Sequence, residues 1–266
     1  MKYLSSIFGI VKKESPILYY IVLILFAGAM LCIPALFIDS RQIMGINAWI
    51  KPFKFFISTG IYTLTVGYLI TFYPFSKLKK HIIRNLVSWT MFLEMVIVTF
   101  QAGRGVQSHY NMSTVFDGVL FGVMGILIGI NVVIMVFFAF ETIRLKLKLS
   151  KAIQYAIFLG WLITIFGSWV GGQMIGQMAH NVGIADGGEG IPLLNWSTIA
   201  GDLRVAHFFG LHSIQIVPLF AWILQKKWTI KTNTLILVVT GFALVFASFI
   251  FYTFYQASEG LPFIKL

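Results

Sequence analysis

The chain alternates long apolar segments with short polar ones. A helix needs about 20 mostly apolar residues to cross the roughly 30 Å of hydrocarbon in a bilayer, and seven segments reach that length. They lack the strict alternation of barrel strands, so they predict membrane-spanning helices. The predicted spans are Pro16–Ile38, Phe53–Tyr73, Ile82–Ala102, Val115–Phe140, Ile153–Met178, Val205–Leu224 and Asn233–Tyr255.

The composition agrees with this pattern. Of 266 residues, 58% are hydrophobic and 11% are charged, whereas an ordinary soluble domain has about 25% charged residues. A soluble core of this length cannot bury so much apolar surface, which excludes a soluble enzyme or a disordered chain. The single cysteine, Cys32, excludes an intramolecular disulfide. The sequence therefore predicts an all-α integral membrane protein, with residues 1–266 forming one transmembrane domain, a bundle of seven helices.

The polar segments alternate in basic charge. Fourteen of the 20 Lys and Arg residues lie before the first span or in the second, fourth and sixth connections. By the positive-inside rule, the N-terminus is cytoplasmic and the C-terminus is outside, which requires an odd number of spans. The net charge of +11 therefore indicates topology and contact with the lipid bilayer, and no nucleic-acid partner.

Glycines recur four residues apart in the fourth and fifth spans. Small residues at this spacing let helix backbones approach closely. We expect them to pack helices within the bundle, the alternative being a homo-oligomer interface through the same two spans. The pairs are Gly118/Gly122, Gly125/Gly129, Gly167/Gly171 and Gly172/Gly176.

Ionisable side chains in or near the spans are costly to bury and are therefore functional candidates. Glu94 lies about 18 Å along its helix, just past the predicted midplane. Eight further candidates lie toward the predicted outer side: Arg104, His109, Asp117, His180, Asp202, Arg204, His207 and His212.

Two spans carry a polar face. At 100° per residue, four polar residues of the third span fall within about 80° of each other, and four of the sixth span share one wedge. Polar faces of membrane helices must contact protein or water. We therefore expect the third and sixth spans to share a buried site that opens outward. The residues are Thr90, Glu94, Gln101 and Arg104, and Arg204, His207, His212 and Gln215.

The outer connections add further candidates. Ser113 or Thr114 is placed to cap the fourth span, which would leave Asp117 in its first turn. The longest connection, His180–Arg204, is glycine-rich and contains Trp196. Such a loop is typical of a lid or a ligand contact; the alternative is an interfacial loop with Trp196 in the aromatic belt.

The leading hypothesis is a membrane metalloenzyme or haem enzyme. Imidazole suits Zn and Fe, and a haem would take axial histidines. Glu94 or Asp202 would act as a base in redox or hydrolytic chemistry on a small or lipid-soluble substrate. The proposed metal ligands are His109, His180, His207 and His212. The proposed ligand contacts are Gln101, Arg104, Asp117, Trp196, Arg204 and Gln215.

Two metal-free alternatives remain. The first is a proton-coupled transporter, channel or sensor of a small anionic ligand. Arg104 and Arg204 would hold the anion, and Glu94 and the histidines would relay protons. The second is a structural subunit of a membrane complex, in which the buried polar groups only fix helix packing.

The segment GDLRVAHFFGLHSIQIVP resembles a group of bacterial multi-pass membrane proteins. DGGEGIPLLNWS before it and GRGVQSHYN earlier in the chain carry the same resemblance, which covers most of the chain. It implies a location in the bacterial cytoplasmic membrane, and it implies no particular activity.

Overall fold

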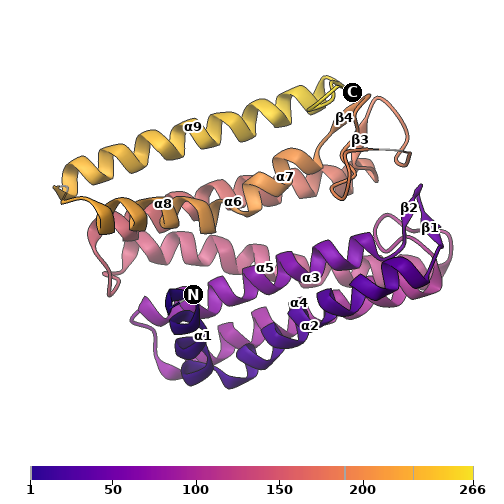
Figure 1. Cartoon of the computed structure of the whole chain (residues 1–266). Helices are drawn as coiled ribbons and strands as arrows, with labels where there is room; N and C mark the ends of the chain where they lie inside the picture. Colours follow the sequence, from indigo (N-terminus) through magenta and orange to yellow (C-terminus); the bar gives the residue numbers. More distant parts are fainter. Residues whose placement is uncertain (1, 189, 230, 266) are drawn as a thin grey trace. The chain divides into compact units, whose positions relative to one another are not determined.

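The structure is a computed structural model that describes residues 2–188, 190–229 and 231–265. Helices dominate it, with two short antiparallel ribbons (Figure 1). The chain divides into two compact units, Met1–Asn131 and Val132–Leu266, and helix α5 runs through the boundary. We describe each unit by itself, and the expectation of one transmembrane domain stays a prediction.

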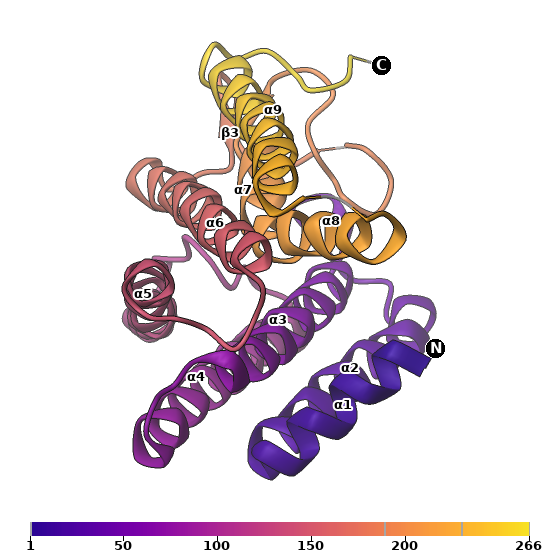
Figure 2. The same ribbon diagram turned by 90° about the vertical axis from the view of Figure 1, so that its left-hand side faces the viewer.

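Unit 1 is built on three long helices. Helix α3 packs against both α2 and α4 (Figure 2), and side chains from α5 complete the core. One apolar cluster joins Ile21 and Leu25 of α2 to Met95 and Val98 of α4 and Met124 of α5. The elements are α1 (Lys2–Glu14), α2 (Pro16–Ile38), β1 (Gln42–Ile43), β2 (Ile46–Asn47), α3 (Ile50–Leu69), the 3-10 turn η1 (Ile70–Phe72), α4 (Lys77–Arg104) and the first part of α5 (Val115–Arg144).

Unit 2 is built around α6, which packs against α7, α8 and α9. Trp161 of α6 is fully buried and stacks on Phe138 of α5, with ring centroids 5.4 Å apart. The elements after α5 are α6 (Lys151–Gln177), β3 (Asn181–Val182), β4 (Gly201–Asp202), α7 (Arg204–Leu211), α8 (Ser213–Lys227) and α9 (Thr232–Ser258).

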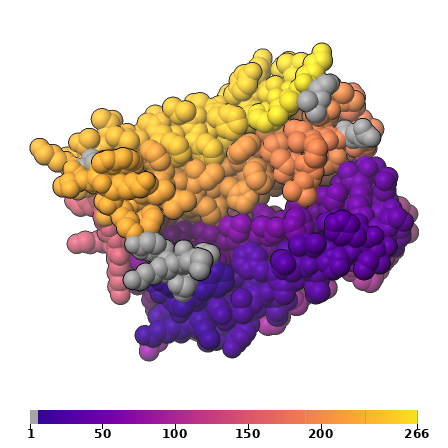
Figure 3. Space-filling view, viewed as in Figure 1, coloured from indigo at the N-terminus to yellow at the C-terminus, as the bar shows by residue number. Residues whose placement is uncertain are grey.

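The predicted spans correspond to helices. Among the described residues, six single helices are long and apolar enough to cross a membrane, and a bent pair, α7 with α8, makes a seventh if it counts as one span. Many of their apolar side chains are exposed. Helix α9, yellow in Figure 3, shows its side chains along its length, and Leu237 and Val245 are each 72% exposed. This exposure suits contact with lipid.

The sixth predicted span, Val205–Leu224, differs from a straight helix. It is broken at His212, where α7 and α8 meet at 45°. Helix α8 resumes five residues before Pro218, and a proline removes a hydrogen bond and crowds the carbonyl four residues earlier. The break therefore falls beside the turn that Pro218 distorts.

The N-terminal segment also differs from expectation. The first element that the sequence predicts begins at Pro16, but residues 2–14 already form helix α1. Its Val11 is fully buried with Leu18 and Val22 of α2. The carbonyl of Glu14 accepts a hydrogen bond from the Arg84 guanidinium of α4 at 2.8 Å. A short helix with one apolar face is stabilised by such packing rather than by its own length.

Only some of the glycine pairs pack helices. A Cβ on Gly167 would lie 2.7 Å from backbone atoms of Gly210, and one on Gly171 would lie 2.8 Å from the His207 ring. These two glycines therefore let α7 approach α6, as predicted. By contrast, Cβ atoms on Gly122 or Gly172 would meet nothing within 4 Å.

We predict that Gly167→Ala destabilises unit 2, because its methyl group would overlap the backbone of α7. Overpacking of this kind costs about 1–3 kcal/mol. Thermal unfolding of the purified protein measures the effect as a lower midpoint. Gly172→Ala, on the same helix but in open space, is the matched control and should leave the midpoint unchanged or raise it. Equal midpoints for the two variants would contradict the proposed helix contact.

Candidate functional site

The candidate site lies in unit 1 at Glu94, on the most buried face of α4. The residue is 1% exposed, and neither carboxylate oxygen has a hydrogen-bond partner. One turn before it, Thr90 lies on the same buried face, as the helical spacing predicts. A buried charge without a hydrogen-bond partner is costly. Thr63, Arg84 and Thr99 also have buried polar atoms without a hydrogen-bond partner, but Glu94 is the carboxylate of the described residues in this unit that has none on either oxygen.

The imidazole of His109 is a titratable group that lies close to this carboxylate. Its Nε2 lies 3.8 Å from Oε1 of Glu94, and its Nδ1 lies 3.0 Å from the Ser108 hydroxyl. Helix α4 ends at Arg104, and Gly105 after it, with a φ of 74°, makes the left-handed turn that leads into the α4–α5 connection. The chain reverses direction at this turn, and the His109 side chain therefore lies against α4.

Aromatic rings surround His109. The ring centroid of Phe55 on α3 lies 5.6 Å away, that of Tyr110 lies 6.1 Å away and that of Phe121 on α5 lies 6.3 Å away. Lys51, one turn before Phe55, is near enough to Glu94 for a Coulombic interaction. The carboxylate therefore lies among an imidazole, an ammonium and apolar rings.

The other predicted polar residues of unit 1 stabilise the α4–α5 connection. Asp117 is 1% exposed and accepts hydrogen bonds from Gln101 at 2.8 Å, from Arg104 at 2.5 Å and from the Thr114 hydroxyl at 2.7 Å. The Thr114 hydroxyl in turn accepts from the backbone N–H of Asp117 at 3.1 Å. Thr114 thus caps α5, as one of our two predicted caps, and Asp117 is fully satisfied.

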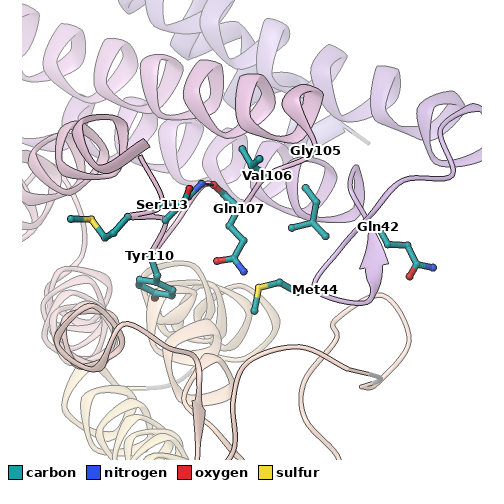
Figure 4. A pocket seen from close by; sticks show the side chains of 10 residues that line it. Gln42, Met44, Gly105, Val106, Gln107, Tyr110 and Ser113 are labelled. Atoms are coloured by element: carbon teal, nitrogen blue, oxygen red, sulfur yellow. Dashed lines mark hydrogen bonds between the residues drawn. The ribbon is translucent and has the colours of Figure 1, made fainter. Parts of the chain in front are cut away.

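A hollow of about 590 Å³ opens between this connection and the β1–β2 ribbon (Figure 4). Met44 and Gln107 point toward each other across it, and Tyr110 also lines it. The ribbon is held against α4 by Arg41, whose guanidinium donates to the carbonyl of Gly103 at 2.9 Å. Tyr110 both lines the hollow and contacts the His109 ring, so it connects the lining of the hollow to the Glu94 site.

In unit 2, His180 and Asp186 form a pair at the start of the long connection. Nδ1 of His180 lies 2.5 Å from the carboxylate, which also accepts the backbone N–H groups of His180 and Asn181. Burial alone would raise the pKa of Asp186. The hydrogen bonds and the charge of His180 outweigh burial and hold this pKa at about 2, below the ordinary 3.8.

Asp202 and Arg204 form a second pair in the same connection. Asp202 is 1% exposed and accepts from the Arg204 side chain at 2.6 Å and from the Ser197 N–H at 2.9 Å. Arg204 also donates to the carbonyl of Asn195. Trp196 is buried against Phe208, Phe209 and Phe263. These side chains fold the connection onto unit 2.

The two histidines at the α7–α8 bend are also engaged. His207 bonds through Nδ1 to the carbonyl of Gly167 at 2.8 Å. His212 packs its ring on Phe208, with centroids 4.7 Å apart, and hydrogen-bonds with Gln215. His180 and His212 both interact electrostatically with His207.

The expected histidine cluster is not found. Among the described residues, no group of three or more His, Cys, Asp or Glu side chains is placed to hold a metal ion. His109 lies in unit 1, whereas His180, His207 and His212 lie in unit 2. For the same reason, the expectation that the third and sixth spans share a site stays a prediction.

Sequence reasoning overlooked several residues around Glu94. Lys51, Phe55 and Tyr110 were not among the candidates, and neither was the hydrogen-bonded pair of Tyr62 and Asn131. Asn131 offered a signal, because a single amide in the apolar fourth span must find a partner. The aromatic rings offered none, because 16% of the chain is aromatic.

Comparisons with protein-family models, with curated proteins and with solved structures give no match. They therefore give no support to the resemblance of the GDLRVAHFFGLH segment to bacterial membrane proteins.

We predict that acid loosens the start of the long connection. Asp186 has a lower pKa folded than unfolded, so its stabilising effect is present above about pH 4 and is lost as the pH falls toward about 2. Hydrogen exchange should show the amides of His180 and Asn181 losing protection over that range. Asp186→Asn should remove this pH dependence. Protection that stays constant across the range in the unsubstituted protein would contradict the assignment.

Proposed function

We propose that the protein is a proton-coupled transporter or sensor of the bacterial cytoplasmic membrane, in which Glu94 and His109 bind and release the proton. The observation that carries the proposal is the isolation of Glu94: it is 1% exposed, its oxygens have no hydrogen-bond partner, and its nearest titratable neighbour is an imidazole at 3.8 Å. Carboxyl and imidazole groups buried in membrane helices are the usual components of proton relays.

A purely structural role would leave Glu94 paired. Two other buried carboxylates show this: Asp117 is held by Gln101 and Arg104, and Glu141 of α5 is bonded by Arg144 at 2.7 Å. Breaking such pairs leaves an uncompensated buried charge. Glu94 has no such bonds, so its charge must be balanced by a proton or by the nearby cations. When Glu94 gains or loses a proton, its electrostatic interactions with His109 and Lys51 therefore change.

In this proposal, a ligand or proton would approach the pair from the hollow. It opens beside Tyr110, at the end of unit 1 that the positive-inside rule places outside the cell. Ligand contacts from Gln107 and Asn111 would be made there. Its described lining includes no charged side chain, which favours a small polar ligand over an anion.

The metal and anion hypotheses have less support. Glu94 and His109 together offer two ligands, fewer than the three that catalytic zinc sites use. Arg104 and Arg204 each hold a carboxylate of their own unit. Neither guanidinium is therefore available to an anionic ligand without first leaving that partner.

We predict that dicyclohexylcarbodiimide, an apolar reagent for protonated carboxyl groups, labels Glu94 in the membrane-reconstituted protein. Labelling should fall as the pH rises, because only the protonated acid reacts. Peptide mass spectrometry locates the modified residue, and Glu94→Gln should abolish modification of that peptide.

Glu141 is the matched control, since it is also buried but bonded to Arg144. It should react far more slowly than Glu94. Equal labelling of the two residues, or no labelling of Glu94 at any pH, would contradict the proposed proton site.

A further inference from the structure

We infer that Asn131 closes the far side of the Glu94 site, so that Glu94 exchanges its proton only with the end of unit 1 where His109 and the hollow lie. This inference rests on the proposed function, and it adds the direction of access. In this inference, Asn131 does not bind or release the proton. It blocks proton transfer between Glu94 and the opposite end of α4.

The geometry at Asn131 is a saturated hydrogen-bond chain across three helices. Asn131 of α5 is 1% exposed, and its Nδ2 donates to the Thr90 hydroxyl of α4 at 2.7 Å and to the carbonyl of Leu127 at 2.9 Å. Its Oδ1 accepts from the Tyr62 hydroxyl of α3 at 3.4 Å. Both amide hydrogens and the amide oxygen are therefore in use.

Thr90 is equally committed. Its hydroxyl donates to the carbonyl of Leu86 at 2.6 Å and accepts from Asn131. It lies one turn from Glu94 toward the opposite end of α4 from His109, a rise of about 6 Å. Neither a hydroxyl fixed in this way nor an amide, which does not titrate in the ordinary pH range, hands a proton to a neighbouring carboxylate.

The other side of Glu94 is different. His109 of the α4–α5 connection and Lys51 of α3 are the titratable groups that act on the carboxylate, with Tyr110 beyond them at the hollow. On the Asn131 side, the titratable group in the described hydrogen-bond chain is Tyr62. An imidazole exchanges protons near neutral pH, whereas a phenol ordinarily does not. Access is therefore one-sided in this conformation, as a sensor or one state of a carrier requires and an open proton channel does not.

The test is proton leak in proteoliposomes that contain a pH-indicating dye and are driven by a potassium diffusion potential. The unsubstituted protein should leak at the rate of protein-free vesicles. Asn131→Asp, which is nearly isosteric and titratable, should raise the leak several-fold. Asn85→Asp, the same change at a partly exposed site near the start of α4, should leave it unchanged.

The double variant Asn131→Asp, Glu94→Gln should return the leak to the background rate, because the path would pass through Glu94. A proton leak that persists in the double variant overturns the inference. The inference is also overturned if Asn131→Asp shows no leak although carbodiimide still labels Glu94 in that variant. Absence of labelling in the unsubstituted protein would instead overturn the proposed function. If Asn131→Asp does not fold, Asn131→Ser, which offers a hydroxyl and space for water, carries the same expectation.

Discussion

Polar groups within apolar helices must be satisfied by the protein itself, because hydrocarbon offers no hydrogen bonds. Unit 1 obeys this constraint along most of the buried polar face of α4. Gln101 bonds Asp117, and Thr90 bonds both its own helix and Asn131. Between these satisfied groups lies Glu94, whose oxygens have no partner. Arg84 and Thr99 of the same helix also have buried polar atoms without a hydrogen-bond partner, but Glu94 is the carboxylate of this face that lacks one. The α4–α5 connection places His109 3.8 Å from it.

The same constraint explains why most of the other polar residues are structural. In unit 2, Asp186 and Asp202 gather backbone N–H groups and fold a long connection that would otherwise leave its backbone unpaired. His207 fills the space that Gly171 leaves open and bonds the carbonyl of Gly167. Their side chains are already fully engaged, so they offer less to a substrate than Glu94 does.

The sequence predicted the helices well, because an apolar run of membrane-spanning length has few other conformations. It also predicted the polar face of α4 and the cap at Thr114, which depend on helical spacing and local bonding. It missed the bend at His212, which depends on Pro218 and on contacts with α6, and it missed helix α1, which is stabilised by packing. Glu94 and His109 were both candidates. Their proximity could not be predicted from their separation in sequence, because the chain leaves α4 and reverses direction between them.

The side chains that lie near Glu94 depend on how α3, α4 and α5 are rotated about their axes and on the path of the α4–α5 connection, and side-chain packing sets both. Infrared spectroscopy across a pH titration tests the central claim most directly, because a protonated carboxyl group has its own carbonyl stretching band. The difference between the unsubstituted protein and Glu94→Gln should contain one such band that disappears as the pH rises. A difference spectrum with no protonated carboxyl band at any pH would contradict the account.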